Sequence, residues 1–153
     1  MKTRGLFILV PLALVLRVFA ADAAPNKAGT LFAGIAKLTD RKAADRGHIA
    51  EDIAKLASST SGRTGVQANV PELIPFLKDE DDVVRYWIAM ALGHIGAPAK
   101  DAVPALVVAL GERVGDMGSK TSASGIRFAL DRIDPTWRSR PDITERIKQR
   151  WPK

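Results

Sequence analysis

The chain has 153 residues, of which 46% are hydrophobic and 26% are charged, and its formal net charge is +6. This composition is typical of one small globular domain and excludes a disordered chain. The absence of cysteine excludes disulfides, thiolate chemistry and cysteine-based zinc sites, and two histidines are too few for a histidine-rich metal site. We therefore expect no cofactor and no bound metal.

The first 23 residues have the pattern of a secretory signal peptide. A basic start over residues 1–4 precedes an apolar run over residues 6–16, and Ala21-Asp22-Ala23 has the form of a small-residue cleavage site. The run is shorter than the roughly 20 residues that a membrane span needs. We expect cleavage after Ala23 and a periplasmic or secreted protein. The alternative is an uncleaved N-terminal anchor.

Residues 24–153 are expected to form a single helical domain. Apolar residues at steps of three and four predict a first helix over about 28–38 and a second over about 42–57, which would form an antiparallel hairpin. The Ser/Thr/Gly-rich stretch 58–69 predicts a mobile connector. Pro71 opens the next helix where its missing N–H costs nothing, and Pro75 inside it predicts a kink or a 3₁₀ turn.

The strongest helical pattern covers residues 83–95. The acidic turn 79–82 precedes it and can cap its positive end, and Gly96 with Pro98 marks its end. Six apolar residues are predicted to form its inward stripe: Val84, Trp87, Ile88, Ala91, Leu92 and Ile95.

Two further helices are predicted over about 101–110 and 120–133, separated by a glycine-rich loop. A last short helix is expected to start at Pro141. No alternating apolar–polar run predicts a strand, so the fold class is all-α.

Part of this pattern occurs twice. Residues 69–77 superpose on 102–110 at an offset of 33, and residues 91–95 superpose on 129–133 at an offset of 38. A helical hairpin with this period indicates an α-solenoid, because each hairpin buries its apolar face only by stacking on its neighbours. We predict a short right-handed α-solenoid of about three hairpins with a C-terminal capping helix.

These repeats resemble HEAT repeats, particularly the short HEAT-like type of phycobilisome lyases. The resemblance rests on Val70-Pro71-x-Leu73-x-x-x-Leu77, on the acidic turn, on Val84-Arg85 and on Ala91-Leu92-Gly93-x-Ile95-Gly96. It is best over residues 70–133, although Ala123 replaces the family's arginine in the second unit.

The resemblance implies that Arg85 bonds an aspartate of the acidic turns and holds the repeats in register, with Asp79 and Asp81 in the same structural role. It also implies that the second helix of each hairpin lines a concave face. Such arrays generally bind other proteins, and a minority carry or assist enzymes that attach or remove small groups.

On the outward side of helix 83–95, Tyr86, Met90 and His94 are spaced by four residues and share one face. Because tyrosine and methionine are typical contact residues, we interpret this stripe as a partner-binding surface. The alternative is that the three side chains pack on the neighbouring hairpin or on stretch 58–69. His94 has no evident catalytic partner, and no nucleophile triad, phosphate loop or HExxH motif is present, so no catalytic residue is predicted.

The acidic turn and the C-terminus each allow two interpretations. The turn could bind calcium, but it lacks the glycine and distal glutamate of an EF-hand loop, so helix capping is preferred. The basic residues after Ser124, which lie near Trp137 and Trp151, could bind an anionic envelope surface or form a solvated cap. Nucleic acid is not expected as the partner of an exported protein.

The function predicted from the sequence is an exported, non-enzymatic protein-interaction module whose partner is another protein. The alternatives are a lyase-like enzyme or accessory subunit of the HEAT-like type, and a binder of an anionic surface. The oligomeric state is left open.

Overall fold

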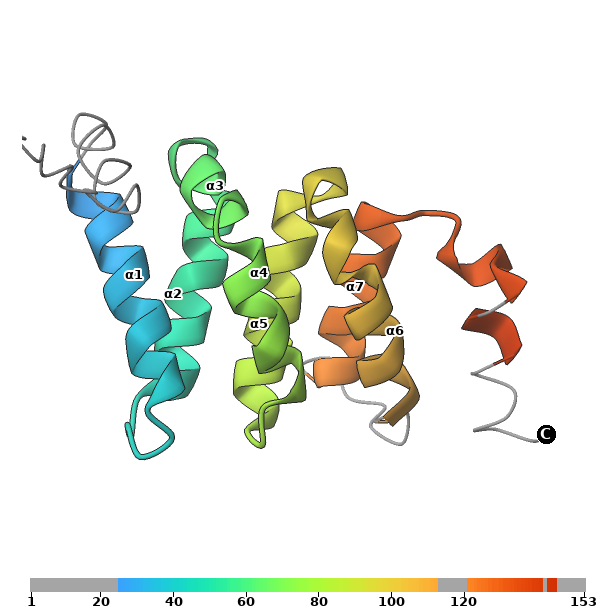
Figure 1. Ribbon diagram of the computed structural model, residues 1–153, viewed down its shortest axis with the longest axis horizontal. Coiled ribbons are helices and arrows are strands. Elements are labelled where there is room, and N and C mark those ends of the chain that lie inside the picture. The colour runs from blue at the N-terminus through green and yellow to red at the C-terminus, as the bar shows by residue number, and fades with distance from the viewer. Residues whose placement is uncertain (1–24, 113–120, 142, 146–153) are drawn as a thin grey trace, which may run out of the picture.

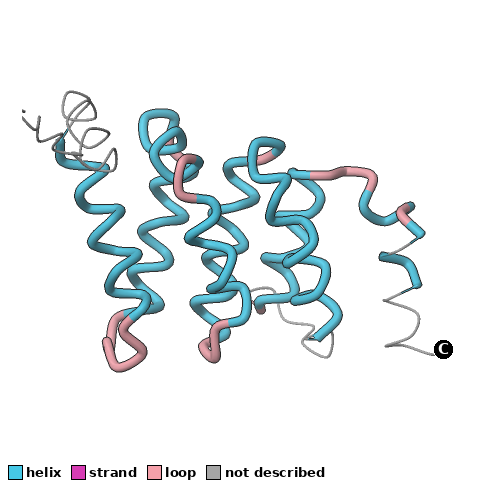
Figure 2. Tube along the Cα trace, in the orientation of Figure 1, coloured by secondary structure: helices cyan, strands magenta, loops and turns pink. Residues whose placement is uncertain are grey.

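The computed structural model describes residues 25–112, 121–141 and 143–145, and within these ranges every regular element is a helix (Figure 2). The predicted all-α class is therefore confirmed. None of the described helices is long and apolar enough to cross a bilayer. The expected signal peptide and the glycine-rich segment 113–120 lie outside the described residues.

Helical hairpins stack along the long axis of the molecule (Figure 1). The first consists of α1 (Pro25–Thr39) and α2 (Arg46–Ser58). The second pairs α4 (Val70–Leu73) and the 3₁₀ helix η2 (Ile74–Lys78) with α5 (Asp82–Ile95). The third pairs the 3₁₀ helix η3 (Ala97–Ala102) and α6 (Val103–Glu112) with α7 (Ser122–Ile133). This is the stacked arrangement predicted from the repeat.

The C-terminal part continues from α7 with the short 3₁₀ helix η4 (Trp137–Ser139). Residues 141 and 143–145 are also helical, in the place where a capping helix is predicted. Ile143 is buried, so this segment joins the hydrophobic core.

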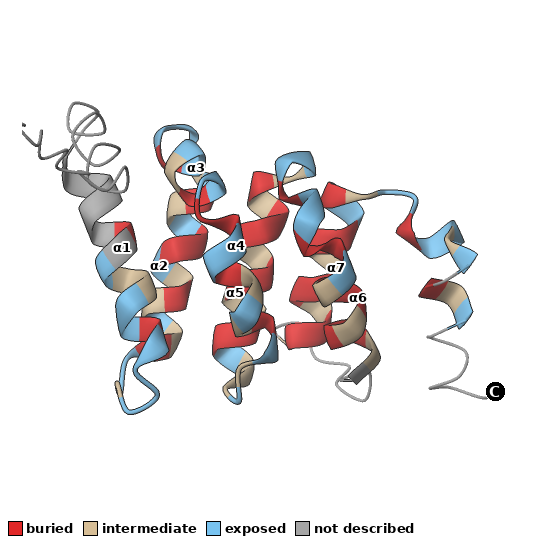
Figure 3. Ribbon diagram, viewed as in Figure 1, coloured by how far each residue is buried: buried red, intermediate tan, exposed pale blue. Residues whose placement is uncertain are grey.

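The second helices of the hairpins form one layer, in which α5 packs along α2 on one side and along α7 on the other. The first helices form the other layer, where α6 contacts η2 and α4 contacts η3. Buried residues gather between the layers and between neighbouring hairpins (Figure 3). Helix α5 is therefore the central element of the array.

The inward stripe of α5 is largely as predicted. Val84, Ile88, Ala91 and Leu92 are completely buried. The prediction for Trp87 is met in part: its side chain packs against the core but is only half-buried, and its ring lies edge-on to Tyr86, with 4.8 Å between centroids. A helix advances about 100° per residue, which places Trp87 at the border of the inward stripe. Its indole therefore contacts the core and is also partly exposed to solvent.

The stretch expected to be a mobile connector is largely a helix, α3 (Thr60–Gln67), and this corrects the prediction. The Ser59 hydroxyl accepts a hydrogen bond from the Gly62 N–H at 3.1 Å and caps the helix. Val66 is completely buried, and a Cβ added at Gly62 would lie 2.4 Å from Leu56 Cδ1. One apolar anchor and one close approach thus outweigh the low helix propensity of the segment.

Pro75 and Gly96 each mark the end of a helix, as predicted. Helix α4 gives way to the 3₁₀ helix η2 at Ile74, one residue before Pro75, which confirms the predicted 3₁₀ turn. Gly96 ends α5 with φ of 76°, a conformation that disfavours residues with a side chain. The chain then turns back through η3 into the third hairpin.

Candidate interaction site

The candidate site is the outward face of α5, the second helix of the middle hairpin. We call its side chains the α5 stripe: Val83, Tyr86, Trp87, Met90 and His94. Val83 is 49% exposed and the other four are half-buried. Since α2, α7 and the first-helix layer cover the rest of α5, this stripe is the part of the helix that remains accessible.

The structure brings together the three residues predicted to bind a partner and adds two that the prediction left out, Val83 and Trp87. The hydrophobic pattern carried a signal for Trp87, because its position borders both faces of the helix. Whether the α5 stripe binds a partner stays a prediction at this point.

Part of the α5 stripe rests on the neighbouring hairpin. A Cβ added at Gly125 of α7 would lie 2.9 Å from the Tyr86 carbonyl oxygen, so the two helices approach closely there. The His94 ring packs edge-on against Phe128, with 5.3 Å between centroids. Packing on the neighbouring hairpin is therefore observed for Tyr86 and His94, both of which also remain partly exposed, while partner binding stays a prediction.

His94 lies in a positive environment. Partial burial, followed by the nearby positive charges of Arg132 and Arg63, lowers the pKa of His94 below its ordinary value of 6.5. The Arg132 guanidinium also lies over the Phe128 ring, 5.7 Å from its centroid. Within the described residues His94 forms no hydrogen bond or ion pair, so the structure supplies no partner for a role in acid–base catalysis.

The α2 side of the face is polar, and its acidic and basic side chains pair with one another. Lys55 pairs with Glu51 at 3.1 Å and with Asp52 at 3.6 Å, and His48 Nδ1 lies 3.7 Å from the same Glu51 carboxylate. Acidic side chains therefore lie beside the Lys55 ammonium, and the α2 side has no positive surplus.

The α7 side differs, because its acidic residue is already engaged from the C-terminal segment. Asp131 accepts a hydrogen bond from Trp137 Nε1 at 2.7 Å and pairs with both terminal nitrogens of Arg138. Arg127 and Arg132, on the same helix, form no ion pair within the described residues, although the charge of Arg127 helps to lower the pKa of Asp131. The α7 side therefore carries a positive surplus.

The basic C-terminal segment is partly neutralised. Arg138 is bound to Asp131 and lies 4.6 Å from the Trp137 ring centroid, and Arg140 pairs with Asp134 at 3.2 Å. Trp137 is 4% exposed and covers the end of the core. Trp151 and the basic residues after Glu145 lie outside the described residues.

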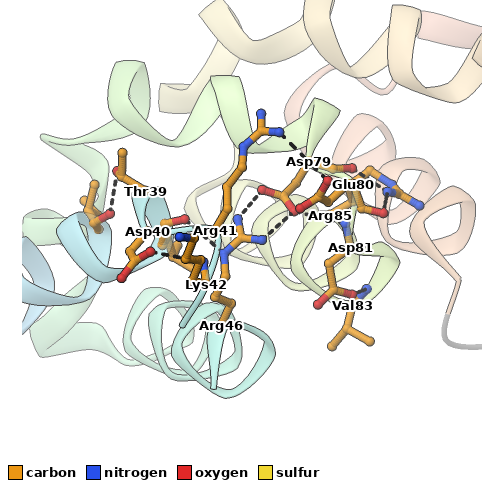
Figure 4. A network of polar contacts seen from close by, with 12 residues as sticks. Thr39, Asp40, Arg41, Lys42, Arg46, Asp79, Glu80, Asp81, Val83 and Arg85 are labelled. Carbon is orange, nitrogen blue, oxygen red and sulfur yellow. Dashed lines mark hydrogen bonds and ion pairs between the residues drawn. The ribbon is translucent and has the colours of Figure 1, made fainter. Parts of the chain in front are cut away.

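The acidic turn before α5 is the main polar junction of the fold (Figure 4). Asp79, at 9% side-chain exposure, binds Arg46 of α2 through both oxygens, and Arg46 Nε also donates to the Leu38 carbonyl at 3.1 Å. The hydrogen bond to Asp79 raises the pKa of Arg46 above its usual range. The first and second hairpins are thus joined by a buried, bidentate ion pair.

Arg85 pairs with an aspartate of this turn, but that aspartate is Asp82, at 2.6 Å, whereas the Asp79 side chain is taken by Arg46. Arg85 also donates to the backbone carbonyls of Asp79 and Glu80. Asp81 caps α5 by accepting from the Val83 N–H at 2.9 Å. The three residues assigned a structural role from the sequence all belong to one network.

The turn also reaches the third hairpin. The second oxygen of Asp82 accepts a hydrogen bond from the Ser122 N–H of α7 at 3.2 Å. Although partial burial acts to raise it, hydrogen bonds from Ser122 and Arg85 hold the pKa of Asp82 below its usual range. The turn therefore contacts all three hairpins.

Sequence reasoning missed Arg46 and Asp82. A usable signal was the arginine in the first turn of each of two second helices, Arg46 in α2 and Arg85 in α5. The turn's carboxylates are used for capping and ion pairing, and within the described ranges no group of three His, Cys, Asp or Glu side chains could hold a metal ion.

A groove of about 520 Å³ lies between α1 and η2 on the first-helix layer. Ile35, Leu38, Pro75 and Phe76 are among its lining residues, and the Arg46–Asp79 pair also borders it. The groove separates the first helices of the first two hairpins, whereas their second helices, α2 and α5, pack directly.

Comparison with known protein families gives a match that covers the hairpins. The sequence profile of the family described as HEAT repeats matches residues 33–123, more than half of the chain and most of the three hairpins. No curated protein and no solved structure matches.

Proposed function

Because the chain belongs to the HEAT repeat family, whose arrays generally act as scaffolds for protein–protein interaction, we propose that it binds another protein through the α5 stripe and catalyses no reaction. The observation that carries this proposal is the accessible apolar and aromatic row on the central helix. Val83 is exposed, and Tyr86, Trp87 and Met90 are half-buried without being enclosed. Aromatic side chains and methionine held in place on one side are typical of interface anchors.

The scaffold supports this role because the row is held rigidly. Helix α5 lies between α2 and α7, and the network of the acidic turn fixes its first turn through Arg85 and Asp82. A rigid surface loses little conformational entropy on binding, so more of the contact energy appears as affinity. We further propose that binding takes place outside the cytoplasm, which rests on the signal-peptide pattern of residues 1–23.

The test is crosslinking in intact cells that make the full chain, followed by mass spectrometry of the captured partner and of the N-terminus. We expect the double variant Tyr86→Ala, Met90→Ala to reduce capture of that partner by at least about tenfold, since two anchors are removed. The mature N-terminus is expected at Ala24.

The matched control is Ile35→Ala with Phe76→Ala, which truncates two half-buried side chains on the first-helix layer. This control should lose stability without losing the partner. Circular dichroism would verify that both variants remain helical. Unchanged capture by the Tyr86, Met90 variant would show that the α5 stripe is not the interface.

A further inference from the structure

The charge beside the α5 stripe is unequal on its two sides, and this asymmetry bears on what the partner carries. Along α2, the Lys55 ammonium is compensated by Glu51 and Asp52. Along α7, Arg132 has no ion pair within the described residues, because Asp131 is bound by Arg138 and Trp137. An approaching segment therefore meets a positive margin on the α7 side.

The positive margin continues at the His94 end of the α5 stripe. Arg63 of α3 donates to the carbonyls of Ala57 and Ser58, at 3.3 and 3.4 Å, and no carboxylate of the described residues pairs with it. Arg63 and Arg132 both lie close enough to His94 to lower its pKa. Two guanidinium groups from different helices thus flank one end of an apolar row.

Phe128 connects the positive margin to the apolar row. Its ring contacts His94 at 5.3 Å and lies under the Arg132 guanidinium at 5.7 Å. A guanidinium stacked on a ring keeps its in-plane N–H groups free, and these match the two oxygens of a carboxylate. An apolar side chain beside that carboxylate would reach the row formed by Trp87 and Met90.

We propose that the α5 stripe binds an acidic segment of its partner, in which glutamate or aspartate alternates with apolar residues, with the carboxylates pairing with Arg132 and Arg63. This inference rests on the proposed function and adds the chemistry of the partner. The apolar residues supply contact area on the row. The carboxylates supply orientation and speed of association, because complementary charge steers encounter and suppresses wrong partners.

Binding of such a segment has a signature at His94. The positive charges facing His94 come from Arg132 on α7 and Arg63 on α3. A carboxylate placed between them compensates both and favours the protonated imidazole. The pKa of His94 should therefore rise when the acidic segment binds, whereas binding through apolar contacts alone adds no compensating charge.

The probe is a short synthetic peptide that alternates glutamate with leucine, compared with a twin in which every glutamate is glutamine. The purified chain is titrated with each peptide, tryptophan fluorescence reports binding, and NMR follows the imidazole of His94, one of two histidines in the chain. We expect the glutamate peptide to bind at least about tenfold more tightly than its twin, with an affinity that falls as salt is raised.

Charge variants complete the experiment. Arg132→Gln should weaken the glutamate peptide about tenfold and leave the twin unchanged. Lys100→Gln, which removes an exposed charge from η3 on the first-helix layer, should change neither. Equal binding of the two peptides, absence of binding by the glutamate peptide, or an unaltered affinity in Arg132→Gln would each overturn the inference.

These failures are distinguishable from failure of the proposed function. If partner capture in cells depends on Tyr86 and Met90 but not on Arg132, the α5 stripe is an interface and its partner is not acidic. If capture depends on neither, the proposed function itself fails. Two results together support the proposed function and the acidic-segment inference. The pKa of His94 rises with the glutamate peptide, and capture is lost both in the Tyr86, Met90 variant and in Arg132→Gln.

Discussion

The buried pair of Arg46 and Asp79 offers the sharpest test of how the array is held together. Replacing Arg46 by methionine keeps most of the side-chain volume but removes the guanidinium. Asp79 then keeps only the Asp81 N–H, at 3.0 Å from Oδ1, and the Leu38 carbonyl loses the N–H of Arg46 Nε. The variant therefore leaves a buried carboxylate without its counter-charge.

The magnitude follows from the burial. The two side chains are 6% and 9% exposed, and removing one partner of a buried pair costs about 3–5 kcal/mol. Both residues border the groove between α1 and η2, so water can reach the orphaned carboxylate and reduce this penalty. We expect Arg46→Met to lower the free energy of unfolding by about 2–3 kcal/mol.

The assay is urea unfolding followed by far-UV circular dichroism. Arg41→Ala is the matched control, because Arg41 and Glu80 also bridge the first two hairpins, but at 3.8 Å and with side chains 77% and 65% exposed. That change should alter stability by less than about 0.5 kcal/mol. Each hairpin contacts mainly its neighbours, so the Arg46 variant should also show earlier unfolding of the first hairpin.

A double variant isolates the charge effect. Adding Asp79→Asn to Arg46→Met removes the unpaired charge while keeping an oxygen for the Asp81 N–H, and it should recover about 1 kcal/mol. The reasoning is refuted if Arg46→Met costs no more than Arg41→Ala, or if the losses from the two single variants simply add.

Two further predictions concern helix contacts and pH. Gly125→Ala should destabilise the protein by about 1–3 kcal/mol, because its Cβ would lie 2.9 Å from the Tyr86 carbonyl oxygen. Gly65→Ala meets no atom within 4 Å and should stabilise α3 by about 0.5–1 kcal/mol. Thermal unfolding of both variants tests the pair, and equal changes in Tm would contradict it. Burial and two arginines lower the pKa of His94 in the folded chain, so the unfolded chain binds this proton more readily and stability should fall as the pH drops below about 6.5. His94→Gln should remove this decline and His48→Gln, at an exposed histidine, should not, which urea titrations across that pH range would measure.

Helix positions and the repeat could be predicted because they follow from local pattern. The helix predicted over 83–95 is observed as Asp82–Ile95, since its capping residues and apolar period agree. Helix α3 could not be predicted in the same way. Its Ser, Thr and Gly residues favour a loop, and only the burial of Val66 and the approach of Gly62 to Leu56, both tertiary effects, make it helical.

The polar junction could be predicted only in part. Arg85, Asp81 and the turn lie within a few residues of one another, so their association is local. Arg46 is 33 residues from Asp79, and nothing in the sequence near it indicates which carboxylate it meets. The unequal charge of the two sides of the α5 stripe also depends on tertiary structure, because the C-terminal segment has to fold back before Arg138 can neutralise Asp131.

Because of the groove on the first-helix layer, the hairpins are packed unevenly along the array. Between the second and third hairpins the helices are in contact in both layers, and Gly93 and Gly125 let α5 and α7 meet at close range. Between the first and second hairpins α2 packs against α5, but α1 and η2 leave space between Ile35 and Phe76. We expect a bend of the array to occur at this joint, because it can narrow the groove while α2 and α5 stay packed beside the Arg46–Asp79 pair. Such a bend would move the first hairpin and preserve the geometry of the α5 stripe.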